Sequence, residues 1–199
     1  MTDGPATAQH PGKPLRADAQ RSIDALLAAA AEVFATAGVD APVRQITARA
    51  GVGAGTLYRH FPQRSDLIAA VFRHEVDACA EAAAALAAQY EPAEALTRWL
   101  LRFTGFIATK HGLAAALHSG NPAYESLPGY FNRRFRPVLG SLLDAAVKAG
   151  QIRPGVDPAD LLRAIGNLTM PAQQDGGHTQ RMIGLLVDGL RFGARPATA

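Results

Sequence analysis

The feature that most constrains the fold of this chain is a glycine between two short helical patterns, residues 43–50 and residues 54–60. Gly51 directly follows the first pattern, and glycine adopts the left-handed backbone of a tight turn without the steric cost of a Cβ atom. Ile46 and Leu57 give each pattern an apolar residue to pack. Two short helices joined in this way form a helix-turn-helix, the smallest unit that places a helix in the DNA major groove.

The charge of the same segment agrees with a nucleic-acid partner. Residues 41–64 carry four arginines and no acidic residue, although the net charge of the whole chain is only +3. Residues 1–75 hold eight Lys or Arg against seven Asp or Glu, so the N-terminal part is not basic overall. An interface with DNA must therefore depend on where the positive charge lies, not on its total.

The side chains of this segment divide by the contacts that they can make with DNA. Arg44 and Arg59 can form bidentate contacts with guanine. Arg64 lies in the first turn of the next helix, where a positive charge is unfavourable by about 0.3–1 kcal/mol because it opposes the helix macrodipole. A phosphate bound at this helix N-terminus would explain why a cation occurs there. The groups that can hold the DNA backbone are those of Thr56, Tyr58 and His60. The small residues that let the helix approach the groove closely are Gly53, Ala54 and Gly55.

A structural interpretation of the same residues is also possible. Tyr58 and His60 can be half-buried helix residues, and the arginines can form a solvated face. For Tyr58 alone the two interpretations have equal weight. For the segment as a whole, the agreement of turn residue, apolar anchors and charge favours DNA binding.

The rest of the sequence predicts further helices and no strands, because apolar residues recur at steps of three and four and never alternate over a sustained run. Gly38 suits the end of the first helix, and Pro62 suits the first turn of the fourth. Later stripes cover residues 96–107, 135–147, 161–168 and 182–190. We expect a flexible arm (1–15), a helix-turn-helix domain (16–62), a linking helix (63–90) and a ligand-binding and dimerisation domain (91–199).

Composition excludes several other classes of protein. Of the 199 residues, 48% are hydrophobic, which is enough for a packed core. The single cysteine, Cys79, excludes an intrachain disulfide and a cysteine-rich zinc site, and it fits a cytoplasmic protein. Neither a signal peptide nor a membrane span is present in the pattern. No catalytic motif occurs, so we expect no enzyme activity, cofactor, metal site or membrane partner.

Residues 121–137 combine three prolines with aromatic residues, and prolines leave irregular walls that favour a pocket. Each aromatic residue is equally consistent with an ordinary core. The two histidines considered for this pocket, His111 and His118, have no nearby carboxylate or thiol in the sequence, so they are weak evidence for a metal site. The arginines of residues 133–136 could meet an anionic ligand, but such a cluster is usually solvated. The candidate pocket residues are Trp99, Phe103, His111, His118, Asn121, Tyr124, Tyr130 and Phe131.

The run from Ile46 to Arg64, and above all Gly-Thr-Leu-Tyr-Arg-His-Phe-Pro at residues 55–62, closely resembles the DNA-binding domain of the tetracycline-repressor-like (TetR) family. The resemblance implies a nine-helix, all-α homodimer. Helices one to three would bind DNA, helix four would link, helices five to seven would enclose a ligand, and the last two would form a four-helix bundle with the partner. Thr47 and Gly53 depart from the usual alanine and serine. The positions that match DNA-contacting sites of the family are Arg44, Thr56, Tyr58, His60 and Arg64.

The last two predicted helices contain Gly166, Gly184 and Gly189, and a glycine inside a helix costs about 1 kcal/mol relative to alanine. Close approach across a two-fold axis would explain them, as would ordinary packing within one chain, and the residues alone favour neither. The resemblance favours the dimer. The residues then expected at its interface are Leu161, Ile165, Leu168, Met182, Leu185, Leu186 and Leu190.

Taken with the resemblance, these patterns predict a ligand-responsive repressor that binds a near-palindromic, double-stranded operator as a homodimer. Its effector would be a small molecule that the sequence does not identify. Two alternatives stay open. One is a DNA-binding activator or nucleoid-type regulator without an effector. The other is a small-molecule-binding protein whose DNA domain is vestigial.

Overall fold

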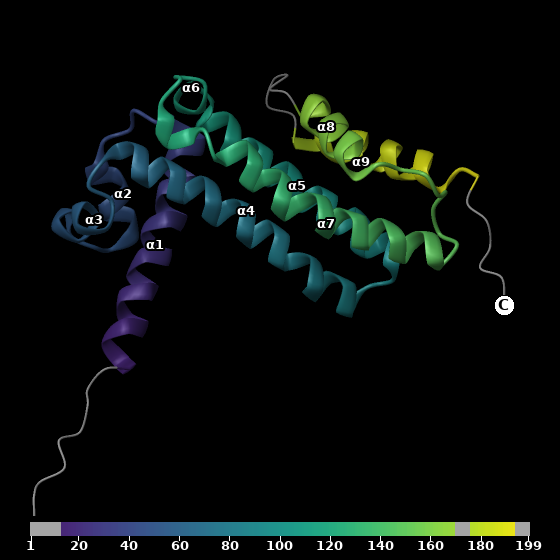
Figure 1. Ribbon diagram of the computed structural model, residues 1–199, viewed down its shortest axis with the longest axis horizontal. Helices are drawn as coiled ribbons and strands as arrows, with labels where there is room; N and C mark the ends of the chain where they lie inside the picture. The colour runs from purple at the N-terminus through teal and green to yellow at the C-terminus, as the bar shows by residue number, and fades with distance from the viewer. Residues whose placement is uncertain (1–12, 170–175, 194–199) are drawn as a thin grey trace, which may run out of the picture.

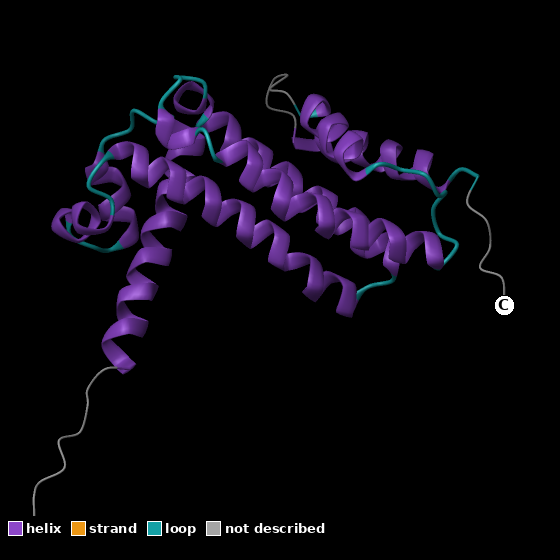
Figure 2. Ribbon diagram, viewed as in Figure 1, coloured by secondary structure: helices purple, strands orange, loops and turns teal. Residues whose placement is uncertain are grey.

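The computed structural model describes residues 13–169 and 176–193, and these residues form nine α-helices, one short 3-10 helix and no strand (Figure 2). The all-α class is therefore confirmed. The first helix, α1 (Lys13–Ala37), begins three residues before the expected start at Arg16. Residues 1–12, which make up most of the predicted arm, lie outside the described residues.

The N-terminal part consists of α1, α2 (Val43–Ala50) and α3 (Ala54–His60), and the bounds of the two short helices are those expected. Gly38 ends α1 with a φ of 76°. Four fully or almost fully buried side chains hold the three helices together: Leu26, Phe34, Ile46 and Leu57. In Figure 1 the N-terminal half of α1 projects away from the body, and α2 and α3 lie beside its other half.

The long helix α4 (Arg64–Gln89) begins later than predicted, because Pro62 precedes its N-cap, Gln63, instead of occupying the first turn. The backbone N–H of Gln63 donates to the Asp66 carboxylate at 2.9 Å, half of a capping box. This bond fixes the start of α4 directly after the helix-turn-helix.

The body of the molecule is a bundle of α4, α5 (Pro92–Gly112) and α7 (Leu127–Lys148), which run along its length in Figure 1. Five aromatic rings pack edge to face or in stacks at its centre. They belong to Trp99, Phe103, Phe106, Phe131 and Phe135. None of the described helices combines the length and apolar character needed to cross a membrane.

Two short elements, α6 (Ala114–Leu117) and the 3-10 helix η1 (Pro122–Tyr124), join α5 to α7 beside the N-terminal part. Pro122 and Pro128 begin helices and do not interrupt them, and only Pro137 lies inside one, α7. At the other end, α8 (Pro158–Leu168) and α9 (Gly176–Arg191) pack on α7 and α5. The break expected at 171–177 falls mostly outside the described residues.

The contact between α1 and α5 is unusually close at Gly112. A Cβ atom there would overlap the carbonyl oxygen of Phe34 and lie 2.8 Å from its carbonyl carbon and 2.9 Å from Ala35 Cα. Backbone therefore meets backbone at this crossing. The end of α5 is fixed against α1, the helix beside which α2 and α3 lie.

Candidate nucleic-acid interface and ligand cavity

The turn between α2 and α3 has the backbone that its glycine predicts. Gly51 has φ 68° and ψ 27°, and the N–H of Val52 donates to the Thr47 carbonyl at 3.1 Å. Thr47 is buried, and its hydroxyl donates back to the Arg44 carbonyl at 3.3 Å. The turn holds α3 across α2 with Leu57 buried between them.

The outer face of α3 is open to solvent. Tyr58 is 53% exposed, which favours the functional interpretation of a residue for which the sequence allowed two. Thr56 and His60 are half-buried beside it. The exposed residues of this face and its N-cap are Gly53, Ala54, Gly55, Tyr58 and Arg59. The structure thus brings most of the predicted DNA-binding residues onto one surface.

Nothing inside the subunit requires glycine at Gly53 or Gly55. Gly53 is the N-cap of α3 with φ −76°, a backbone that any residue adopts. A Cβ atom at either position would meet no other atom within 4 Å. Gly53 caps α3 without a side-chain hydrogen bond, as glycine can. These two positions therefore present backbone and no side chain to solvent.

The four arginines of residues 41–64 have different surroundings. Arg49 forms an ion pair with Glu32 of α1. Arg64 donates to the carbonyl oxygens of Val39 and Ala41, each at 2.5 Å, and lies over the Phe34 ring. The guanidinium groups of Arg44 and Arg59 are exposed and bond to no other described residue.

Arg64 has partners inside the subunit that the sequence did not indicate. The sequence assigned its charge to a DNA phosphate because the cation lies at the wrong end of a helix. In the structure two carbonyl oxygens of the loop between α1 and α2 accept its hydrogen bonds. Those partners lie 25 and 23 residues away in the chain, beyond the reach of a local pattern, and they account for the cation without a phosphate.

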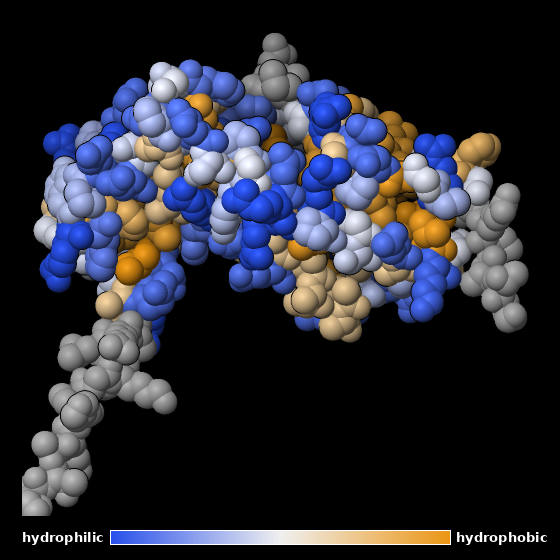
Figure 3. Space-filling model, in the orientation of Figure 1, coloured by the Kyte–Doolittle hydropathy of each residue, from blue (hydrophilic) through white to orange (hydrophobic). Residues whose placement is uncertain are grey.

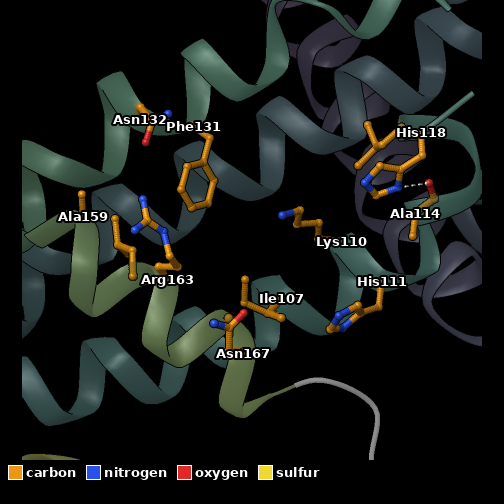
Figure 4. Close-up of a pocket in the computed structure, with 13 residues that line it drawn as sticks. Ile107, Lys110, His111, Ala114, His118, Phe131, Asn132, Ala159, Arg163 and Asn167 are labelled. Atoms are coloured by element: carbon orange, nitrogen blue, oxygen red, sulfur yellow. Dashed lines mark hydrogen bonds between the residues drawn. The ribbon is translucent and has the colours of Figure 1, made fainter. Parts of the chain in front are cut away.

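A cavity of about 480 Å³ lies between α5, α6, α7 and α8 (Figure 4). It brings together three of the predicted pocket residues, His111, His118 and Phe131. Figure 4 shows the Lys110 side chain directed into the space between Phe131, Arg163 and Ile107. The residues that line it are Ile107, Lys110, His111, Ala114, Leu117, His118, Phe131, Asn132, Ala159, Leu162, Arg163, Gly166 and Asn167.

Comparison with known proteins decides the family. A model described as bacterial regulatory proteins of the tetR family matches residues 26–71, and a model of the SbtR-like transcriptional regulator C-terminal domain matches residues 91–192. A TetR regulator from Streptomyces coelicolor is 37% identical, with 88% of this chain and 99% of that chain covered and a TM-score of 0.74. The chain belongs to the TetR family. It is a transcriptional regulator with a DNA-binding N-terminus.

Other comparisons agree with this assignment. A TetR regulatory protein from Mycobacterium vanbaalenii is 36% identical, with 89% of this chain and 99% of that chain covered and a TM-score of 0.73. The TetR-like regulator LfrR from Mycobacterium smegmatis, solved in complex with proflavine, is 21% identical over 85% of this chain and 95% of that chain, with a TM-score of 0.63. It therefore shares the fold. No curated protein matches the chain significantly.

Several predicted pocket residues lie elsewhere in this TetR fold. Trp99 and Phe103 are completely buried in the bundle, and the Trp99 indole donates to the Cys79 carbonyl at 2.9 Å, so both belong to the core. The Tyr130 hydroxyl donates to Asp77 of α4 at 2.6 Å. Asn121 and Tyr124 line a separate cleft beside α6, and Tyr124 also lines a smaller cavity that adjoins the first. Aromatic composition alone did not separate core from pocket.

The polar residues that line the cavity include four that sequence reasoning missed: Lys110, Asn132, Arg163 and Asn167. They come from three helices, and no spacing along the chain brings them together. The predicted cluster at residues 133–136 does not line the cavity. Its Arg134 instead pairs with Asp77 at 2.6 Å.

The histidines of the cavity differ in environment. Burial, followed by the charge of Lys110, lowers the pKa of His111. His118 follows α6, and its Nδ1 donates to the Ala114 carbonyl at 2.8 Å. Within the described part of the chain, no three His, Cys, Asp or Glu side chains are grouped closely enough to hold a metal ion. Both imidazoles line the cavity.

The residues predicted at a TetR dimer interface divide by burial. Leu161, Ile165 and Leu190 are at most 4% exposed within one subunit, so they belong to its core. Leu168 and Leu185 are exposed to 39% and 65%. Met182 and Leu186 are half-buried. Helical periodicity shows that a stripe is apolar but not which surface it packs against. The prediction therefore grouped residues that face the core of the subunit with residues that face outward.

Proposed function

We propose that this TetR regulator is a repressor that binds a near-palindromic operator as a homodimer and releases it when a small molecule binds. The observation that carries the proposal is the pair of exposed guanidinium groups of Arg44 and Arg59, which have no partner among the described residues. Arg44 lies on α2 and Arg59 on α3, the helix that also carries the exposed Gly55. Arginine is the side chain that most often reads guanine in the major groove.

A dimer is supported by the outer face of α8 and α9. Leu168, Leu185 and Phe192 are large apolar residues that remain 39%, 65% and 83% exposed. A Cβ atom at Gly184 or Gly189 would meet nothing within 4 Å, so packing inside the subunit does not require glycine there. Figure 3 shows apolar surface toward the end of the molecule where these helices lie. Such a face suits a symmetric contact with a second copy.

A response to a ligand is supported by the position of α6. Ala114 and Leu117 line the 480 Å³ cavity, whereas Ala115 and Ala116 line a cleft whose other side is formed by Val39, Asp40 and the start of α4. A ligand that displaces α6 would thus act on the DNA-binding part. It must favour the non-binding conformation, typically by about 1–3 kcal/mol, since equal affinity for both would change nothing.

The DNA-binding surface is tested by the salt dependence of duplex binding. We expect the logarithm of the association constant to fall steeply with the logarithm of salt concentration, because phosphate contacts release counterions. Arg59→Ala and Arg44→Ala should each weaken binding at every salt concentration. Arg136→Ala, a change at an exposed arginine of α7, is the matched control and should leave binding intact. Equal effects of all three changes would contradict the proposed surface.

A further inference from the structure

The charge of the cavity between α5, α6, α7 and α8 selects its ligand. Four of its lining residues carry or can carry positive charge: Lys110, His111, His118 and Arg163. None of the lining residues is acidic. Two amides, Asn132 and Asn167, supply the remaining polar side chains. A cationic ligand would meet like charge here and no carboxylate.

Lys110 carries a positive charge that no acidic side chain of the described residues compensates. It is half-buried near the end of α5, and its Nζ lies 5.8 Å from the centre of the Phe131 ring. No carboxylate of the described residues lies within 4.0 Å of it. A cation over an aromatic ring gains modest stabilisation, and an anion placed beside it would gain more.

Arg163 differs, because its charge is already shared. It pairs with Asp160 on the exposed side of α8 at 3.6 Å, and both side chains are about three-quarters exposed, at 74% and 77%. Ion pairs as exposed as this one contribute little. Arg163 therefore adds to the positive potential of the cavity but does not replace Lys110.

The rest of the lining is apolar. Ile107, Leu117, Phe131 and Leu162 contribute hydrocarbon surface to the cavity. A second cavity, of about 280 Å³, adjoins it and adds more apolar wall from Phe72, Leu127 and Pro128. The two cavities share the residues Lys110, Leu117, His118, Phe131 and Asn132. Lys110 and Phe131 thus lie where a polar group and an apolar body can be bound side by side.

From this arrangement we infer that the effector is a small apolar molecule with one acidic group, which Lys110 binds while Phe131 and its apolar neighbours hold the body. The inference rests on the proposed function, since it names the class of the ligand that would release DNA. The acidic group pairs with Lys110 Nζ, because the Asn132 amide already donates to the Pro128 carbonyl at 3.0 Å. The volume of the two cavities suits a compact aromatic or aliphatic acid.

Three probes with one ring system and different charge test the inference: naphthylacetate, the neutral naphthylacetamide and the cationic naphthylethylamine. Their affinities for the full chain are measured by isothermal titration calorimetry near neutral pH. The acid should bind at least about tenfold more tightly than the amide, which corresponds to about 1.4 kcal/mol. The amine should bind more weakly than either.

Lys110→Met keeps the length of the side chain and removes its charge, so it should abolish the preference for the acid and leave the affinity of the amide unchanged. Lys110→Arg should retain the preference. Lys148→Met, at an exposed lysine near the end of α7, is the matched control and should bind all three probes as the natural chain does. Unchanged binding of the amide shows that the variant is folded.

Three outcomes would overturn the inference. The amide or the amine binds as tightly as the acid, or Lys110→Met binds the acid as before, or none of the three probes binds. Duplex DNA affinity, measured on the same samples, separates these failures from failure of the proposed function. Intact DNA binding with any of the three outcomes rejects the acidic effector alone, whereas absent DNA binding rejects the regulator itself.

Discussion

The arginines of the helix-turn-helix segment make three kinds of contact. Arg49 pairs with Glu32, Arg64 donates to two carbonyl oxygens, and the guanidinium groups of Arg44 and Arg59 remain exposed. Only the last kind leaves a guanidinium free for a base or a phosphate. Identical residue types in one 24-residue segment thus have separate roles, and their long-range partners decide which role each has.

Arg64→Ala should lower the free energy of unfolding and leave the salt dependence of DNA binding unchanged. Its guanidinium makes two charge-assisted hydrogen bonds to the loop that precedes α2, and such bonds contribute about 1.5–3 kcal/mol each. Denaturant unfolding measures the first effect and fluorescence anisotropy of labelled duplex the second. A salt slope reduced by about one unit, with stability intact, would restore the phosphate contact that the sequence suggested.

Cys79 should be unreactive in the folded protein. Its side chain is 3% exposed, and burial raises its pKa to about 12. The thiolate is the reactive form, so at pH 8 the native thiol should react with a disulfide reagent only as fast as the subunit opens. Addition of denaturant should make the reaction immediate. Immediate reaction without denaturant would show that α4 and α5 are not packed as described.

Sequence reasoning succeeded where the determinants are local. The turn at Gly51, the burial of Ile46 and Leu57 and the bounds of α2 and α3 all follow from residues within about a turn of one another. It did not indicate that Trp99 and Phe103 are fully buried, because an aromatic residue in a stripe has the same pattern in a core as in a pocket wall. Lys110 was missed because the cavity exists only once four helices have packed.

Among the helices, the crossing of α1 and α5 couples the DNA-binding part to the bundle. The contact depends on the absence of a side chain at Gly112, where backbone of Phe34 and Ala35 occupies the space that a Cβ atom would need. Backbone atoms cannot move aside as the end of a flexible side chain can. This crossing therefore has no room for a side chain at residue 112.

Gly112→Ala should destabilise the protein by about 1–3 kcal/mol, the usual cost of overpacking. Gly105→Ala is the matched control on the same helix, since a Cβ atom there meets nothing within 4 Å. The control should be neutral or stabilising by up to about 1 kcal/mol, because alanine favours helix. Thermal unfolding of both variants measures the difference. Equal stability of the two would show that α1 and α5 do not meet this closely.

At the scale of the whole molecule, one subunit leaves Leu168 of α8 and Leu185 of α9 exposed on an apolar outer face. Leu185→Glu places a charge at a residue that is 65% exposed, so it should not disturb the fold of the subunit. It should shift the chain toward monomer in sedimentation velocity and weaken DNA binding. Ala85→Glu, on the exposed face of α4, is the control and should do neither. An unchanged dimer in Leu185→Glu would place the interface elsewhere.

The most direct test of the account is selection of bound sequences from a random pool of duplex DNA by the full chain. The account predicts enrichment of near-palindromic sequences whose two half-sites lie about one helical turn apart, 10–10.5 base pairs, with the enrichment lost in Arg59→Ala. Enrichment of a single, unsymmetrical site, or no enrichment at all, would contradict the claim that the α3 surfaces of two subunits bind the two half-sites.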